Sequence, residues 1–141
     1  MGSPPYALLG LWLDANIGDV EIATGLAAMA IKPTAEFRNF EALDIRAGRI
    51  VQVDDAQTRK PTYRLTIDFG PEVGTKISCG AYRNYAKDAL LGKTVVCVVN
   101  LGIKKMGPEI SEVLVLGIAN AAGETVYLTT GQTVPLGGAV F

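Results

Sequence analysis

KTVVCVVNLGIKKMGPEISEVLVLG, residues 93–117, carries the pattern that decides the fold. Its two apolar runs, Val95–Val99 and Val113–Leu116, are rich in β-branched residues and too short for ordinary helices, so they are typical of buried strands that pair with each other. Between them stand two adjacent cations, Lys104 and Lys105, and a Gly-Pro turn that stops either strand from continuing. The stretch therefore predicts a charged loop on a rigid apolar frame, an arrangement that suits recognition.

A long strand is predicted ahead of this stretch, over residues 43–55 (LDIRAGRIVQVDD). Gly48 lies inside it, and a glycine within a long strand is typical of a bulge or bend that lets one strand serve both halves of a small barrel. Ile50 is predicted to point away from the face that carries Ile45, Ala47, Val51 and Val53.

Two strands with clear alternation follow. Residues 63–69 (YRLTIDF) place an apolar residue at every second position and point Arg64 outward. Residues 76–79 resume the alternation after a glycine-rich turn, with the apolar members predicted inward and Lys76 and Ser78 outward. Arg64 and Lys76 are therefore expected to share a surface.

Two short helices and a tail complete the pattern. Residues 34–43 begin with the N-cap residue Thr34 and repeat apolar residues at helical spacing. Residues 82–91 (YRNYAKDALL) also have helical spacing, after the third strand. A further strand is predicted around 126–128, and the glycine-rich end, residues 135–141, is expected along a barrel rim or against a partner.

Five short strands with a helix between the third and fourth are the order of an OB-fold, whose ligands bind on strands 2 and 3 and on the loops joining strands 1 to 2 and 4 to 5. The sequence thus predicts an all-β, five-stranded OB-fold barrel with a helix between strands 3 and 4, a short N-terminal helix and a C-terminal extension. The cations at the ligand-binding places are Arg64, Lys76, Arg59, Lys60, Lys104 and Lys105.

Residues 34–141 form one predicted domain, preceded by an extension over residues 1–33. The apolar piece Tyr6–Leu13 is only eight residues long and has no positive charge before it, so neither a membrane span nor a signal peptide is expected. Met29 begins MAIKPTAEF, which has the form of a natural start and would leave residues 1–28 as an upstream or appended element.

The composition excludes several kinds of site. The chain contains no histidine, which removes Ser-His-Asp and Cys-His catalysis and the usual zinc sites. Cys79 and Cys97 each lie in an apolar strand pattern and are expected in the core, with a disulfide or a reactive thiol as the alternative; such cysteines favour a cytoplasmic location. Asp54-Asp55, and Asp68 with Glu72, lack the spacing of a calcium loop, so no metal and no cofactor are expected.

The charge distribution allows a local nucleic-acid contact. Residues 1–28 hold three acids and no Lys or Arg, which leaves the other 113 residues with a net charge of +2. The Lys104-Lys105 pair is consistent with a solvated hairpin tip or with a phosphate-binding loop whose affinity falls in salt.

A second pattern, Tyr82 and Tyr85 beside Arg83, is also open to two interpretations. The rings and the cation could form a platform on which unpaired bases stack. Alternatively, their three-residue spacing is what a helix requires to seal itself against the barrel.

Two stretches, FEALDIRAGRIV at residues 40–51 and NLGIKKMGPEISEVLVLG at residues 100–117, closely resemble the tRNA-binding domain family. The resemblance extends from about residue 37 to the C-terminus. Within the family, KPTYRLTIDFG (60–70), SEVLVLG (111–117) and VPLGG (134–138) are most similar to the branch of CsaA-type protein-export chaperones.

The resemblance implies an OB-fold homodimer that catalyses nothing. CsaA-type proteins are described as binding exposed segments of precursor proteins, and the wider family binds tRNA through its barrel face and basic loop. By position, Lys104, Lys105 and Ser111 fall in that loop and the following strand start, and Lys76 and Ser78 fall on the third strand. The candidate nucleic-acid-binding residues are therefore Lys104, Lys105, Lys76, Ser78, Arg64, Arg83 and Ser111.

Three classes of function follow. The leading hypothesis is a CsaA-like chaperone that binds unfolded precursor polypeptides as a two-fold dimer, with the C-terminal segment or the helix near Phe37 crossing to the partner. The competing hypothesis is a tRNA or structured-RNA binder that serves translation. The weakest is an enzyme that uses Cys79 or Ser78 without histidine.

Overall fold

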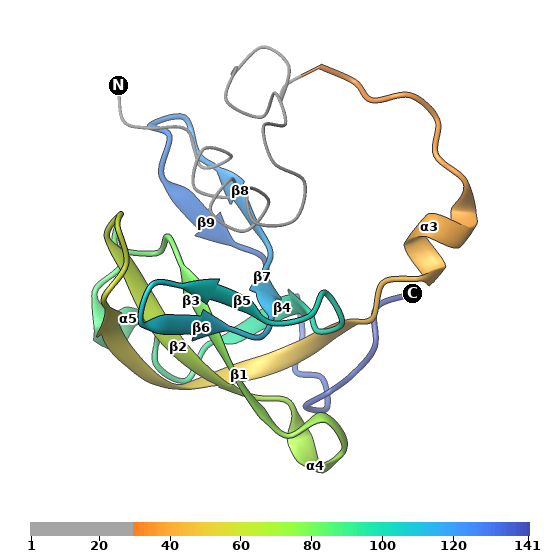
Figure 1. Cartoon of the computed structure of the whole chain (residues 1–141). Helices are drawn as coiled ribbons and strands as arrows, with labels where there is room; N and C mark the ends of the chain where they lie inside the picture. Colours follow the sequence, from red (N-terminus) through yellow and green to blue (C-terminus); the bar gives the residue numbers. More distant parts are fainter. Residues whose placement is uncertain (1–29) are drawn as a thin grey trace.

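The structure, a computed structural model, describes residues 30–141, so the predictions for Tyr6–Leu13 and Met29 lie outside the described residues. Five antiparallel strands form one curled sheet in the order β3-β2-β1-β4-β7 (Figure 1). Their bounds are Ile45–Ala56 for β1, Thr62–Asp68 for β2, Thr75–Gly80 for β3, Thr94–Val98 for β4 and Leu114–Val115 for β7. Two separate hairpins are formed by β5 (Lys104–Met106) with β6 (Glu109–Ser111), and by β8 (Gly117–Ala119) with β9 (Thr125–Tyr127).

The sheet curls until its two ends meet. Next to β7, the Glu112 N–H donates to the Ile77 carbonyl of β3 at 2.7 Å, and the Ile77 N–H donates to Glu112 Oε1 at 3.0 Å. One short helix, α5 (Lys87–Leu90), lies between β3 and β4. The chain is therefore the all-β, five-stranded OB-fold barrel that the sequence predicts.

The core is built on β2, whose alternation is confirmed. Leu65, Ile67 and Phe69 are at most 1% exposed. Gly48 of β1 crosses directly over them, because a Cβ added there would lie 2.6 Å from Ile67 Cγ2 and 2.7 Å from the Phe69 ring. Only glycine allows β1 to pass this close to the core.

The bulge in β1 lies elsewhere than predicted. The register with β2 shifts between Ile50 and Gln52, not at Gly48. Ile50 is 1% exposed and Val51 is 47% exposed. Ile50 points away from the face of Ile45 and Ala47, as predicted, and its face is the core face that Gly48 shares. The extra residue after Ile50 brings Val53, the partner of Leu65, to this core face as well, so the expected grouping of Val53 with Ile45 and Ala47 is wrong.

The helices are short. The predicted N-terminal helix is confirmed as α3 (Phe37–Glu41), but Glu36 rather than Thr34 is its N-cap residue, and α3 buries none of its side chains. The predicted helix over 82–91 is confirmed only over α5, because residues 82–85 form a turn in which the Tyr85 N–H donates to the Tyr82 carbonyl at 3.0 Å. A one-turn helix, α4 (Gly70–Val73), joins β2 to β3. Within residues 30–141, no helix has the length and apolar character to cross a membrane.

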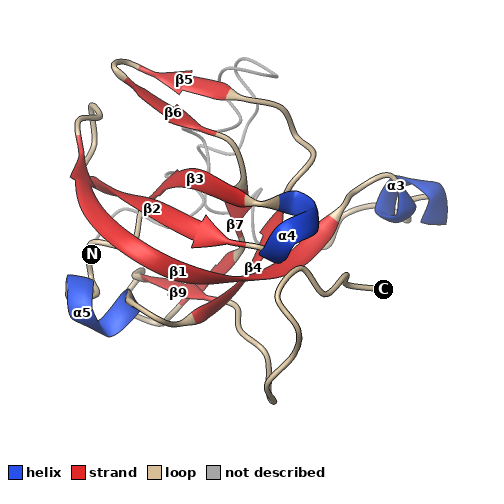
Figure 2. Cartoon of the chain, turned by 90° about the horizontal axis from the view of Figure 1, so that it is seen from below, coloured by secondary structure: helices blue, strands red, loops and turns tan. Residues whose placement is uncertain are grey.

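The C-terminal segment runs along β1, as predicted for a tail on the barrel rim. The Ala47 N–H donates to the Gly138 carbonyl at 2.9 Å, and the Val140 N–H donates to the Ile45 carbonyl at 2.8 Å. This segment covers the first half of β1 and brings the C-terminus to the same side of the barrel as α3 (Figures 1 and 2).

Candidate nucleic-acid interface

The β5–β6 hairpin forms a layer over the outer face of β2 and β3 (Figure 2). Ser111 Oγ accepts a hydrogen bond from the Cys79 N–H of β3 at 3.1 Å and donates to the Val113 carbonyl at 3.2 Å. Cross-strand pairing puts Lys104 opposite Ser111, and Lys105 opposite Ile110. One side of the hairpin therefore faces the barrel, and the other side faces away from it.

The two adjacent lysines point to opposite sides of this hairpin. Lys104 is 7% exposed and shares the barrel-facing side with the buried Ser111, whereas Lys105 is exposed on the other side. The expectation of a lysine pair projecting from a hairpin tip is therefore wrong for Lys104, because neighbouring residues in a strand alternate between faces.

Arg64 is held by carboxylates. Its Nη1 donates to both oxygens of Glu109 at 3.0 and 3.1 Å, and its Nη2 lies 3.6 Å from Asp54. The hydrogen bond to Glu109 raises the pKa of Arg64. The pKa of Glu109 is lowered, first by the hydrogen bond that it accepts from the Gln57 N–H at 2.9 Å and then by Arg64. Glu109 therefore joins the hairpin to β2 and to the β1–β2 loop, and this set of contacts is called the Glu109 latch below.

The register of β2 and β3 reverses the predicted faces of β3. Ser78 lies opposite the core residue Leu65 and is 2% exposed, and Lys76 lies two residues earlier on the same face. Cys79 lies opposite Arg64 on the outer face. The expectations that Ser78 points outward and that Arg64 and Lys76 share a surface are therefore wrong. The alternation misleads because the hairpin buries the outer face of β3 as well.

Neither cysteine is activated. Cys79 and Cys97 are both free and buried. Burial, followed by the charge of Glu109, raises the pKa of the Cys79 thiol to about 11, and burial also raises the pKa of Cys97. Cys97 belongs to the core, as expected, but Cys79 lies under the hairpin, where its thiol donates to the Ile110 carbonyl at 3.5 Å. Thiols of this kind stay protonated and unreactive at neutral pH, which removes the support for a cysteine-dependent enzyme.

Arg83 lies against the start of β2. Its Nε donates to the Thr62 carbonyl at 2.9 Å, and its guanidinium carbon lies 5.0 Å from the centre of the Tyr63 ring. Its Nη2 is 3.5 Å from Asp55, which Lys87 also approaches at 3.3 Å. Arg83 is thus partly exposed but already paired.

The two tyrosines beside Arg83 pack rather than form an open platform. Tyr82 is 3% exposed, and its hydroxyl donates to the Val115 carbonyl at 3.2 Å. Tyr85 is half-buried, and its ring centre lies 5.2 Å from that of Tyr127. The sealing interpretation is therefore confirmed for Tyr82.

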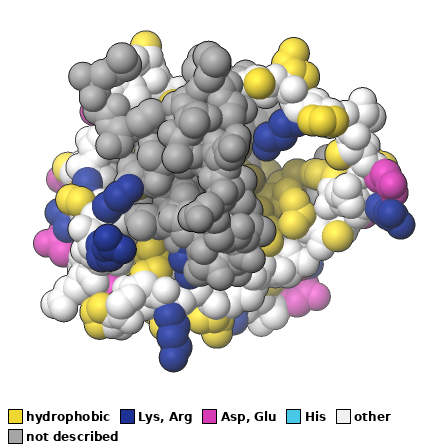
Figure 3. Space-filling view, turned by 45° about the horizontal axis from the view of Figure 1, so that its top comes forward, with side chains coloured by type: hydrophobic (Ala, Val, Ile, Leu, Met, Phe, Trp, Pro, Cys, Tyr) yellow, Lys and Arg dark blue, Asp and Glu magenta, His cyan; other side chains and the backbone are white. Residues whose placement is uncertain are grey.

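Three exposed cations lie on two loops that touch. Arg59 and Lys60 belong to the β1–β2 loop and Lys105 to the hairpin, and the hydrogen bond from Gln57 to Glu109 joins the two loops. In the space-filling view, several Lys and Arg side chains lie toward the left edge with Asp and Glu side chains among them, and hydrophobic side chains line a hollow at the right (Figure 3). The basic loops predicted for strands 1–2 and 4–5 are thus neighbours.

The sequence reasoning missed the carboxylates that face these cations. Glu109 and Asp54 pair with Arg64, and Asp55 pairs with Arg83. For Glu109, the sequence held one indication of such a pairing, which was the presence of an acid inside the basic loop. The other two pairings depend on strand register, which the alternation of apolar residues does not reveal.

Comparison with known proteins agrees with this architecture. The family model for a putative tRNA binding domain matches residues 45–139. Methionine–tRNA ligase of Chloroherpeton thalassium is 36% identical over 93 residues, which are 66% of this chain and 13% of the ligase. That of Herminiimonas arsenicoxydans is 33% identical over 106 residues, which are 75% of this chain and 15% of the ligase. This chain thus spans a small fraction of the curated relatives that it matches.

Two solved structures are similar to this chain over their whole length. The CsaA chaperone protein from Picrophilus torridus is 37% identical with a TM-score of 0.73, and the comparison covers 77% of this chain and 100% of that one. Chaperone CsaA from Bacillus anthracis is 35% identical with a TM-score of 0.73 and the same coverage, 77% and 100%. Because the family model matches well over half of its residues, this chain belongs to the family of putative tRNA-binding domains.

Proposed function

We propose that the chain is a non-catalytic binding protein that forms a two-fold homodimer and holds unfolded segments of precursor polypeptides. One observation carries the proposal, a set of large apolar side chains left exposed on one side of the barrel. The members of this apolar surface are Phe37, Phe40, Leu43, Leu101, Ile103, Val140 and Phe141.

Hydrogen bonds bring the three segments of the apolar surface together. The Asp44 N–H donates to Asn100 Oδ1 at 2.8 Å, and Asn100 Nδ2 donates to the Ala42 carbonyl at 2.9 Å, which joins the end of α3 to the segment before β5. The Val140 N–H donates to the Ile45 carbonyl, which brings in the C-terminus. An exposed apolar patch built from several segments is typical of an interaction site.

The dimer is assigned to α3 and the C-terminal residues. A five-residue helix that buries no side chain gains little from helix propensity, and Phe37 and Phe141 are 70% and 109% exposed. A second copy related by two-fold symmetry would cover these rings. The outward side of the β5–β6 hairpin, with Ile110 beside Lys105 and close to Ile103, would then stay open to a polypeptide.

The similarity to two CsaA chaperones along their full length supports this function. The test measures the mass of the chain in solution by light scattering, and its affinity for a permanently unfolded polypeptide such as reduced, carboxymethylated α-lactalbumin. We expect a dimer, and about tenfold weaker polypeptide binding in Ile103→Ser/Ile110→Ser than in the control Ile118→Ser/Val126→Ser, which removes exposed apolar side chains from the β8–β9 hairpin. A monomer at micromolar concentration rejects the dimer, and equal affinities reject the polypeptide site.

RNA binding is the second candidate, because Arg59, Lys60 and Lys105 lie exposed on touching loops. Arg59→Gln/Lys60→Gln/Lys105→Gln should weaken tRNA binding and lower the slope of log affinity against log salt by about two to three. Polypeptide binding should not change. An unaltered salt slope would remove these loops from the RNA site. RNA contacts stay predictions for the other candidate residues, which are Lys104, Ser78, Ser111, Arg64, Lys76 and Arg83. Those of them that lie on the outer face of β2 and β3 can reach RNA only if the Glu109 latch opens.

A further inference from the structure

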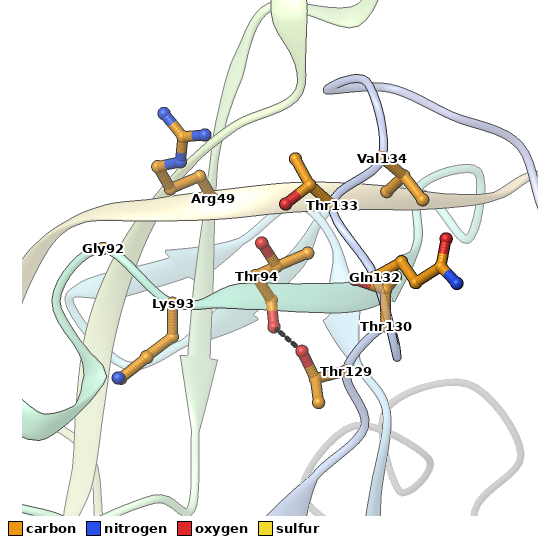
Figure 4. A pocket seen from close by; sticks show the side chains of 9 residues that line it. All are labelled: Arg49, Gly92, Lys93, Thr94, Thr129, Thr130, Gln132, Thr133 and Val134. Carbon is orange, nitrogen blue, oxygen red and sulfur yellow. Dashed lines mark hydrogen bonds between the residues drawn. The ribbon is translucent and has the colours of Figure 1, made fainter.

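A pocket of about 300 Å³ lies beside the start of β4, formed by residues that neither proposal uses. Arg49 comes from β1, Lys93 and Thr94 lead into β4, and residues 129–134 follow β9 (Figure 4). Figure 4 shows Arg49 and Lys93 along one margin, with Gln132, Thr133 and Val134 across from them. The residues that line it are Arg49, Gly92, Lys93, Thr94, Thr129, Thr130, Gln132, Thr133 and Val134.

Backbone hydrogen bonds fix the backbone positions of Arg49 and Lys93. Arg49 is the cross-strand partner of Thr94. The Ile50 N–H donates to the Lys93 carbonyl at 2.9 Å, and the Gly92 N–H donates to the Ile50 carbonyl at 2.7 Å. Arg49 and Lys93 are therefore neighbours on a rigid part of the barrel, although their sequence separation is large.

No carboxylate neutralises these cations within the described part of the chain. None of the nine lining residues is acidic, and neither Arg49 nor Lys93 forms an ion pair with a residue in the range 30–141. Asp68 is the partner of Arg49 on β2, but its Oδ1 accepts a hydrogen bond from the Gly70 N–H at 2.8 Å.

The opposite wall supplies hydrogen-bond donors. Thr129 Oγ1 donates to the Thr94 carbonyl at 2.7 Å, which holds the segment in place. The backbone N–H groups of residues 129–134 donate to no described residue, and the hydroxyls of Thr130 and Thr133 are likewise not engaged by residues 30–141. Hydroxyl, amide and cationic side chains line this one space, and groups of these kinds bind phosphate.

We propose that this pocket is an anion site that takes the phosphate group of a nucleotide, either free or within an RNA chain. Its volume is at the small end of ligand sites, which fits one phosphate and its sugar rather than a larger molecule. The site is separate from the β5–β6 hairpin and from the apolar surface, so it does not depend on the function proposed above.

The test uses the ¹⁵N-labelled full chain and matched ligands. AMP should shift the backbone amide signals of Thr130, Gln132 and Thr133 in a saturable manner, inorganic phosphate should shift the same signals, and adenosine, which has no phosphate, should not. Arg49→Gln/Lys93→Gln should weaken AMP binding about tenfold or more, because it removes both charge-assisted contacts. The control Lys32→Gln/Lys87→Gln changes the net charge equally at exposed positions outside the pocket and should bind as the unaltered chain does.

Three results would overturn the site: no saturable shift at about 10 mM AMP, equal shifts with adenosine, or equal affinity in the two double variants. A short single-stranded RNA identifies the source of the phosphate. Tighter binding of the RNA than of AMP at these amides assigns the site to RNA, and tighter binding of AMP assigns it to a free nucleotide. Either result supports the phosphate site.

Discussion

Two groups of cations on this barrel differ in what faces them. On the outer side of β2, Arg64 meets Glu109 and Asp54, and at the start of the same strand Arg83 meets Asp55. In the pocket beside β4, Arg49 and Lys93 share a lining with Thr and Gln side chains and form no ion pair with a residue of the described range 30–141. A cation already paired and hydrogen-bonded holds the fold together, whereas an unpaired one is available to a ligand.

The difference teaches that the number of Lys and Arg residues near a candidate site is a poor guide to binding. The position of the acids decides which cations are available. This claim is testable. Changing a side chain in the paired group should lower the stability of the fold, whereas changing one in the unpaired group should leave the stability unaltered and weaken phosphate binding.

The largest effect is expected from Glu109→Gln, which leaves the guanidinium of Arg64, on the outer face of β2, opposite an amide. Hydrogen bonds to charged groups contribute about 1.5–3 kcal/mol each, so the free energy of unfolding should fall by about 2 kcal/mol. Urea unfolding followed by circular dichroism measures it. A loss below about 0.5 kcal/mol, the range of ordinary surface substitutions, would show that the Glu109 latch does not hold the hairpin.

The pH dependence checks the same latch independently. The pKa of Glu109 is lowered in the folded chain from its ordinary 4.5. A carboxyl with a depressed folded pKa contributes stability above its unfolded pKa, and that contribution is lost as the pH falls through the folded value. The unaltered chain should therefore lose stability more steeply than Glu109→Gln below about pH 4.5. Parallel profiles would contradict the assignment.

The second effect concerns Cys79, which reports whether the hairpin is closed. Its thiol has a pKa of about 11 because it is buried, and the charge of Glu109 adds to the rise. Glu109→Gln removes that charge and loosens the cover, so the thiol should react with a disulfide reagent at pH 8 about tenfold faster. Cys97, in the core, is the internal control and should stay unreactive in both chains. Equal rates at Cys79 would mean that the hairpin stays closed without Glu109.

Much of the fold could be predicted from the sequence, because β2 has one buried face and β4 and β7 lie in short apolar runs rich in β-branched residues. The alternation over residues 63–69 and the apolar runs around Cys97 and Val115 predict β2, β4 and β7. The assignment of faces failed at β3, which is covered on both sides. Cys79 and Ser78 of β3 are both buried, and the alternation that assigns faces carries no signal there. The bulge after Ile50 was also misplaced, because Gly48 has a packing role instead.

The candidate site was less predictable than the fold. The sequence placed the basic loops correctly, but it could not show that Lys104 turns inward or that Glu109 binds Arg64, because both depend on tertiary contacts of the hairpin. The pocket of Arg49 and Lys93 was missed for a related reason. Its two cations are far apart in the sequence and carry no motif, and strand pairing alone makes them neighbours.

The third effect comes from Arg83→Gln. This change removes the hydrogen bond to the Thr62 carbonyl, the contact with the Tyr63 ring and the ion pair with Asp55. Because the side chain is partly exposed, the expected loss is about 1 kcal/mol in the free energy of unfolding. The variant Lys87→Gln is the control, since it removes only an exposed ion pair to the same Asp55 and should cost less than about 0.5 kcal/mol. If both variants cost the same, the ring and carbonyl contacts of Arg83 do not stabilise the fold.

The smallest effect on stability is expected from Arg49→Gln, although Arg49 has the same charge as Arg83 and lies on strand β1 of the barrel. Arg49 is exposed and forms no ion pair within the described range, so the free energy of unfolding should change by less than about 0.5 kcal/mol. Urea unfolding under the conditions used for Arg83→Gln gives a direct comparison. A loss as large as that of Arg83→Gln would make Arg49 a structural residue and end the distinction between paired and available cations. A variant that keeps its stability and loses phosphate binding would instead show that Arg49 contributes to ligand binding rather than to the stability of the fold.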